Sequence, residues 1–117
     1  ARTGWLGALQ DRQVGRAIAA IHRDPAHPWT VASLAAVAAV SRSAFAARFS
    51  ERVGMPALQY VTQWRMHLAL GWLRARQGES LAQLAARAGY QSEAAFSRAF
   101  KRVNGMSPGA AQRLGGG

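Results

Sequence analysis

Few side chains in this sequence have the types that acid-base, nucleophilic or metal chemistry requires. The acidic residues and histidines are scattered singly, and no two carboxylates have the spacing of a catalytic or metal-binding pair. These residues are Asp11, Asp24, Glu51, Glu79, Glu93, His22, His27 and His67. Cysteine is absent, which excludes disulfides, thiolate zinc sites and cysteine nucleophiles. The sequence therefore indicates neither an enzyme nor a metal or cofactor site.

Basic side chains are abundant instead. Lysine and arginine number 15 against five acidic residues, which gives a net charge of +10 in 117 residues. Such a surplus favours polyanions, with nucleic acid first and an anionic membrane surface second. No apolar run approaches the roughly 20 residues that a membrane-spanning helix needs. The chain lacks an initial Met and a signal segment, so we expect part of a longer cytoplasmic protein whose remainder precedes Ala1.

The elements that position these basic side chains occur twice. The segments "TVASLAAVA" (30–38) and "SLAQLAARA" (80–88) are identical at five of nine positions, and "FAARFSERVGM" (45–55) matches "FSRAFKRVNGM" (96–106) in its Phe, Gly and Met residues. Each copy predicts a short helix, a tight turn and a longer helix, which is a helix-turn-helix. One copy is weak evidence because helical bundles imitate the pattern. Two copies with a strong positive charge are stronger evidence for nucleic-acid binding.

Capping residues and helix breakers predict the bounds of the first copy. Asp11 is expected to cap a helix that buries Val14, Ile18 and Ile21 and ends before the prolines of "RDPAHPW". The next helix is expected to start after Thr30 and to end near Ala38, with Val31, Leu34 and Val37 inward. Ser41 or Arg42 opens a helix that Gly54 ends.

The second copy repeats this pattern. Ser80 is expected to cap a helix with Leu81 and Leu84 inward, and a helix from Ser92 to Asn104 ends at Gly105. A brief last helix starts at Pro108. A short amphipathic turn is also expected near the start of the chain, at Trp5, Leu6 and Leu9.

A long helix is expected between the two copies, over "PALQYVTQWRMHLALGWLRARQ" (56–77), and Gly78 closes it. Its inward residues are expected to be Tyr60, Val61, Trp64, Leu68, Trp72 and Leu73. Gly71 lies inside this helix, where it would let a neighbour approach closely. About 20 residues span about 30 Å, close to the ~34 Å between successive major grooves on one face of DNA. One chain could thus present two helices, one helical turn apart, to an asymmetric site.

The outward faces of the two longer helices differ in chemistry. Phenylalanines at i, i+4 point inward in both, which turns the opposite faces to solvent. Arg98 could bind guanine O6 and N7 through two hydrogen bonds, whereas the Ala and Ser side chains of the first copy offer methyl packing or a single hydrogen bond. The outward face of the first copy carries Ser43, Ala47 and Ser50, flanked by Ala46 and Glu51, and that of the second carries Ala94, Arg98 and Lys101, beside Ser97 and Arg102. Glu93, near the helix start, could accept a hydrogen bond from cytosine N4. A surface Arg98 without a base contact, and a Glu93 that only complements the helix dipole, remain alternatives.

Phosphate contacts need less exact placement, because helix N-termini and basic side chains favour phosphate generally. Each individual charge is better read as an ordinary solvated residue, but as a set some must lie along the backbone if DNA is the partner. The candidate phosphate contacts are Thr30, Ser41, Arg42, Arg48, Arg65, Ser80, Ser92, Lys101 and Arg102.

The chain resembles the DNA-binding module of the AraC/XylS family of bacterial transcription regulators. The resemblance rests on "IHRDPAHPWTVASLA", "SRSAFAARF", "GMPALQYVTQWRM", "LAARAGYQSEAAFSRAFKR" and "GMSP", and it spans about residues 14–113. The opening "GWLGALQDRQVGRAIAAIHRDP" is similar to members that carry a cupin-like sensor before this module. The resemblance implies an all-α fold with two helix-turn-helix subdomains and a linker helix, and two recognition helices in successive major grooves.

The resemblance implies base reading at positions that match these outward faces. The candidate base-reading residues are Ser43, Ala46, Ala47, Glu93, Ala94, Ser97 and Arg98. The chain departs from the family at Ala46 and Ala47, where members often have Arg or Gln, which puts strong readout by the first copy in doubt. Pro56-Ala57 also replaces the common Ser-Pro before the linker helix.

The expected organisation follows from these elements. Residues 1–13 would extend from a sensor domain, 14–55 form the first subdomain, 56–78 the linker helix, 79–113 the second subdomain and 114–117 a disordered tail. The first hypothesis is a sequence-specific reader of double-stranded DNA in a transcription activator that touches RNA polymerase beside its site. No membrane partner is expected. A small-molecule effector would act only through the sensor domain, and the 117 residues alone would be monomeric.

Two other classes of protein are open at this point. A nonspecific basic protein that coats nucleic acid would need no repeat with two distinct outward faces. A basic interaction module or membrane-surface binder would need a wide apolar stripe on an exposed helix, whereas the apolar residues here are consumed by two cores.

Overall fold

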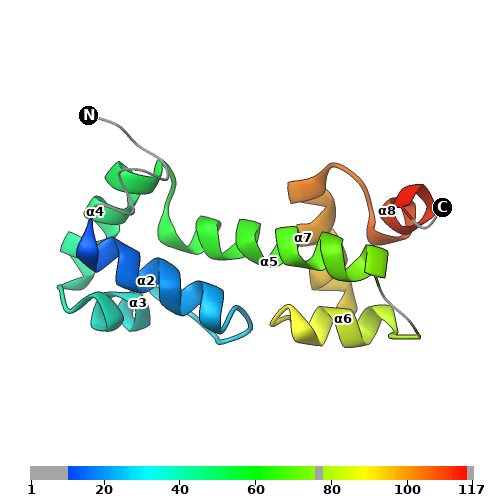
Figure 1. The fold of residues 1–117 in the computed structure, drawn as a ribbon, viewed down its shortest axis with the longest axis horizontal. Helices are drawn as coiled ribbons and strands as arrows, with labels where there is room; N and C mark the ends of the chain where they lie inside the picture. Colours follow the sequence, from blue (N-terminus) through cyan, green and yellow to red (C-terminus); the bar gives the residue numbers. More distant parts are fainter. Residues whose placement is uncertain (1–10, 76–77, 116–117) are drawn as a thin grey trace. The chain divides into compact units, whose positions relative to one another are not determined.

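The chain is all-helical throughout the part that the computed structural model describes, residues 11–75 and 78–115 (Figure 1). The helices are α2 (Arg12–Arg23), α3 (Val31–Ala38), α4 (Arg42–Val53), α5 (Ala57–Ala75), α6 (Leu81–Arg87), α7 (Glu93–Asn104) and α8 (Pro108–Gly115). The chain divides into two compact units, Ala1–Val61 and Thr62–Gly117. This confirms the expected all-α fold. The turn expected at Trp5, Leu6 and Leu9 lies outside the described residues.

Polar caps begin the helices where the sequence predicts them. The Asp11 carboxylate accepts the backbone N–H groups of Gln13 and Val14 at the start of α2. Thr30 and Ser80 each form a capping box. The cap side chain accepts the N–H of the third residue on, and the side chain of that residue accepts the N–H of the cap. These bonds satisfy the donors that each helix start leaves without a partner inside the helix.

The first unit packs α2, α3 and α4 against one another around an apolar core. Its buried residues are Val14, Ala17, Ile18, Ala20, Ile21, Leu34, Ala35, Ala38, Phe45, Phe49, Ala57 and Val61. Alanines make up much of this set, and their small side chains let neighbouring helices approach closely. The two phenylalanines of α4 supply the largest apolar groups.

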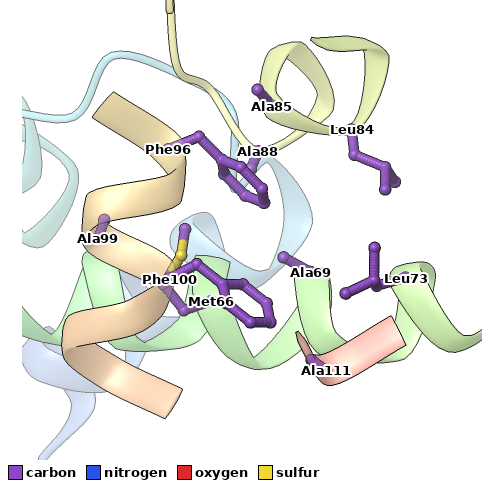
Figure 2. Packing of buried hydrophobic residues seen from close by; sticks show 10 residues of the cluster. All are labelled: Met66, Ala69, Leu73, Leu84, Ala85, Ala88, Phe96, Ala99, Phe100 and Ala111. Atoms are coloured by element: carbon purple, nitrogen blue, oxygen red, sulfur yellow. The ribbon is translucent and has the colours of Figure 1, made fainter. Parts of the chain in front are cut away.

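The second unit has a core of the same design (Figure 2). Phe96 and Phe100 project from α7 into a cluster that α5, α6 and α8 complete. The other buried members are Met66, Ala69, Leu73, Leu84, Ala85, Ala88, Ala99 and Ala111. The inward set predicted for the long helix omitted Met66 and Ala69, which are fully buried. Leu68 is only partly buried.

Two predictions about single apolar positions are wrong. Val37 was expected inward but is 36% exposed. The buried face of α3 consists of Leu34, Ala35 and Ala38. Around the helix axis, Ala35 and Ala38 lie to one side of Leu34 and Val37 lies to the other. Gly71 was expected to permit close approach of a neighbour. It is exposed, and a Cβ built on it meets nothing within 4 Å.

One helix end differs from the expected bounds. α8 includes Leu114 and Gly115, which were assigned to the disordered tail, whereas α2 begins at Arg12, directly after its Asp11 cap, as expected. Gly78 has a φ of 82°, as expected of a residue that follows a helix, although α5 is described only to Ala75. Residues 116–117 lie outside the described part.

Candidate nucleic-acid interface

Both helix-turn-helix turns use the same backbone geometry. Ala39 and Gly89 have φ angles of 62° and 89°, in the left-handed region. The next residue in each turn donates its N–H back to the preceding helix, from Val40 to the Ala35 carbonyl at 3.1 Å and from Tyr90 to the Ala85 carbonyl at 2.9 Å. The axes of α3 and α4 are bent by 86°, close to the angle of a helix-turn-helix.

α4 presents the outward face that the sequence predicts in the first unit. Phe45 and Phe49 are buried to 1% and 0% exposure, which fixes the rotation of the helix about its axis. Ser43 and Ala47 are therefore exposed, and Ala46 is partly buried at the edge of this face. The Ser41 hydroxyl caps the helix by accepting the Ala44 N–H at 3.2 Å.

α7 presents the corresponding face in the second unit. Phe96 and Phe100 are buried as their counterparts are, and they leave Glu93, Ala94 and Arg98 exposed. Ser97 is half-buried, so its reach is shorter than the sequence suggests. The predicted base-reading residues thus lie on one face of each helix. Base reading by these residues stays a prediction.

The predicted hydroxyl contacts to phosphate are exposed and already act as helix caps. Ser41, Ser80 and Ser92 accept the backbone N–H three residues on, which leaves each hydroxyl proton able to reach an outside acceptor. Thr30 differs, because its hydroxyl also donates to Ser33 Oγ at 3.2 Å.

The predicted basic contacts to phosphate have two kinds of surroundings. Arg42, Lys101 and Arg102 are exposed on the outward sides of α4 and α7. Arg65 is partly buried, with its guanidinium 5.8 Å from the centre of the Tyr90 ring. The Arg48 Nε lies 3.7 Å from Asp11 Oδ2, so this arginine already has an anionic neighbour within its own unit.

Sequence reasoning missed two ionic groups. Asp11 Oδ2 also lies 3.5 Å from the Nε of Arg52, so one carboxylate faces two arginines of α4. In the second unit Arg87 donates a hydrogen bond to the Glu79 carboxylate at 2.7 Å. Its guanidinium carbon lies 4.1 Å from the centre of the Trp72 ring, and this contact joins α6 to α5. The contacts of Asp11 with α4 and of Arg87 with Trp72 have no local signal, because the partners come from separate elements.

A hydrogen-bonded histidine and tyrosine pack against the buried side of α4. His22 Nε2 and the Tyr60 hydroxyl are hydrogen bonded at 2.7 Å. The Tyr60 and Phe49 rings pack edge-to-face, with their centres 5.8 Å apart. Burial lowers the pKa of His22 below its ordinary value of 6.5 and raises the pKa of Tyr60 above its ordinary 10.0. Both shifts favour the neutral form of each group.

Other kinds of site find little support in the described residues. Across residues 11–75 and 78–115, no group of three or more His, Cys, Asp or Glu side chains could hold a metal ion. In the same ranges no single helix is long and apolar enough to cross a membrane. α3 and α4 meet that length and composition test only as a strongly bent pair.

The comparisons with known proteins agree with this geometry. The family model described as "Helix-turn-helix domain" matches residues 34–113, which include both outward-facing helices. A Streptomyces antibioticus protein named as an AraC-like transcription regulator is 54% identical over 108 residues, which cover 92% of this chain and 35% of that protein. The chain belongs to the AraC-type helix-turn-helix family. The transcriptional regulator AlkR of Acinetobacter baylyi is a further relative, 45% identical over 104 residues, or 89% of this chain and 34% of that protein.

Solved structures of other proteins share the fold. The DNA-binding domain of AdpA, solved in complex with a target DNA, is 29% identical to this chain with a TM-score of 0.80. The match covers 86% of this chain and 89% of that one. The C-terminal domain of AraT from Geobacillus stearothermophilus is 27% identical with a TM-score of 0.83, and the match covers 88% and 85%. The chain spans about a third of the length of the curated relatives it matches.

Proposed function

We propose that this AraC-type domain reads double-stranded DNA sequence-specifically, with α4 and α7 as recognition helices in successive major grooves. The observation that carries the proposal is the pair of outward faces, fixed in rotation by Phe45 and Phe49 on α4 and by Phe96 and Phe100 on α7. A helix with one face locked into a core presents a defined set of side chains to a groove, as direct readout requires.

The two recognition helices would contribute unequally. α7 exposes Arg98, a side chain that can form two hydrogen bonds to guanine. α4 has Ala47 at the equivalent place, with Ser43 and Ala46 beside it, so its readout would rest on methyl packing and single hydrogen bonds. The phosphate contacts predicted above, together with the charge of +10, would supply the sequence-independent share of the affinity.

The wider role follows from the regulators that the chain resembles. We place the domain in a bacterial transcription activator that works on chromosomal DNA in the cytoplasm and touches RNA polymerase beside its site. An N-terminal cupin-like sensor would bind the small-molecule effector, and the 117 residues alone would bind DNA as a monomer. An isolated domain that activates transcription without added effector, when its site is placed at varied distances from a promoter, would support this assignment of roles.

The experiment that tests the proposal is selection of binding sites from a random duplex library at near-physiological salt. Two short, unlike blocks about one helical turn apart are expected, one for each recognition helix. Enrichment of a single block would restrict base reading to one helix. DNA binding without any enrichment would contradict the proposal and favour a nonspecific nucleic-acid-binding protein.

A further inference from the structure

The acidic side chain that caps α2 and two basic side chains of α4 form an ionic cluster in the first unit. Asp11 uses its two oxygens differently. Oδ1 accepts the N–H groups of Gln13 and Val14 at 3.0 Å each, and Oδ2 faces Arg48 and Arg52 at 3.7 and 3.5 Å. The Asp11 side chain is only 8% exposed. Cations close to a nearly buried carboxylate offset the cost of removing it from water.

The two arginines keep most of their capacity to bind another anion. Their Nε atoms lie farther from Asp11 than the 2.7–2.9 Å of a charge-assisted hydrogen bond. Their side chains are 45% and 42% exposed. Asp11 therefore offsets the charge of the arginines without saturating their donors, since each guanidinium carries five N–H groups.

Their place on α4 points to the identity of that anion. Arg48 and Arg52 are one helical turn apart on the edge of α4 between the buried phenylalanines and the exposed Ala47. When α4 lies in a major groove, its edges run beside the sugar-phosphate backbone, whose oxygens match the planar guanidinium fork.

We propose that Arg48 and Arg52 together bind a backbone phosphate beside α4, and that Asp11 competes with that phosphate for the same side chains. This inference rests on the proposed function, because it takes α4 to be a recognition helix. A phosphate contact of this kind would let the Ala-rich first unit bind DNA without reading bases. Asp11 then limits how tightly the first unit holds DNA of any sequence.

The test is the salt dependence of DNA binding by the 117-residue chain, measured by fluorescence anisotropy on a selected duplex and on a random duplex. Arg48→Gln with Arg52→Gln is expected to reduce the slope of log K against log salt by at least about 0.9, the value for one phosphate contact. The loss of affinity is expected to be equal on both duplexes. Arg16→Gln with Arg23→Gln is the matched control, because it removes the same charge from exposed positions of α2. A slope equal to that of this control would overturn the proposal.

The competition is tested separately with Asp11→Asn. Asparagine keeps an oxygen for the helix cap and removes the charge. We expect roughly two- to threefold tighter binding to both duplexes, the size expected for removing one charge about 6–10 Å from a phosphate in water. The gain is expected to vanish when both arginines are glutamine. An equal gain in that background would show that Asp11 acts on the DNA directly and would overturn the competition.

Two further variants guard against misfolding. The triple variant Asp11→Asn, Arg48→Gln, Arg52→Gln leaves no buried carboxylate without a cation, so it reports the slope even where the double variant is unstable. Arg48→Lys with Arg52→Lys keeps the charge and is expected to restore the slope. Because the random duplex is measured too, a chain with no sequence preference would contradict the proposed function alone, and an unchanged slope would contradict the phosphate site alone.

Discussion

At the scale of single residues, the proposed function gives Arg98 the main base-reading role on α7. Its exposed position on α7 corresponds to Ala47 on α4. Equivalent positions of the two helices therefore carry a guanidinium in one unit and a methyl group in the other. A bidentate contact to guanine discriminates between bases by about 1–3 kcal/mol. A phosphate contact at the same place would lower affinity for every sequence alike.

Arg98→Ala should therefore weaken binding to the selected duplex about ten- to a hundredfold, with a much smaller loss on random duplex. The measurement is a pair of binding titrations at one salt concentration. Arg102→Ala is the matched control, because Arg102 is exposed one turn further along α7 and is predicted to contact phosphate. Equal losses on both duplexes for Arg98→Ala would assign this residue to the backbone.

His22 gives the first unit a pH-dependent stability. Because burial lowers its pKa, the folded chain binds fewer protons than the unfolded chain when the pH falls below 6.5. The free energy of unfolding should thus fall as the pH is lowered from 7 through 6.5 and on toward the pKa of the folded state. Urea unfolding at a series of pH values would show this slope.

His22→Gln should flatten that slope, because glutamine does not titrate. His67→Gln, at an exposed position of α5, is the control and should keep the slope of the unmodified chain. A slope that survives in the His22 variant would assign the acid sensitivity to other groups.

At the scale of the elements, the two turns make the same demand on different residues. Gly89 adopts a positive φ without steric cost, whereas Ala39 adopts φ 62° with its Cβ in a crowded position. Ala39→Gly should therefore stabilise the first unit by up to about 1 kcal/mol, and Gly89→Ala should destabilise the second by about 1 kcal/mol or more. Urea midpoints followed by circular dichroism would measure both changes. Destabilisation by Ala39→Gly would mean that the alanine methyl makes a packing contact worth more than the strain.

The long helix α5 offers a gain in stability at Gly71. Its Cβ position is open and its backbone is helical, so Gly71→Ala should raise the free energy of unfolding by about 0.5–1 kcal/mol. Gly105 is the matched control, because its Cβ position is equally open but its φ is 80°. Gly105→Ala should lower stability. A loss of stability at Gly71 would show that the glycine permits a bend that α5 needs.

Local chemistry explains which elements could be predicted from the sequence. Asp11, Thr30 and Ser80 cap helices through neighbours two or three residues away, so a short window of sequence contains the whole interaction. The exposure of Val37, the open surroundings of Gly71 and the pairing of Asp11 with α4 depend on the packing of separate helices. No local window contains that information. The outward faces of α4 and α7 were predictable because an i, i+4 pair of phenylalanines fixes a helix face by itself.

At the scale of the whole molecule, one chain carries two helix-turn-helix units with similar cores and different exposed faces. A symmetric dimer reads the same half-site twice. Two unlike units in one chain would read two different blocks in a fixed order, so the site would have a direction. That direction would orient the regulator relative to a promoter. The family match includes both units, but the identity of each block depends on residues that differ between them.

This separation of roles leads to a prediction about one half of the site. Ala47→Arg gives α4 the side chain that α7 has at Arg98, on an exposed position where a longer side chain causes no burial. It should add a preference for guanine in the block read by the first unit and leave the other block unchanged. Repeating the library selection with this variant measures the change. Ala19→Arg, which adds the same charge at an exposed position of α2, should alter neither block. A change in both blocks would mean that the two helices do not read separate grooves, since a substitution on α4 can alter contacts only in the groove that α4 occupies.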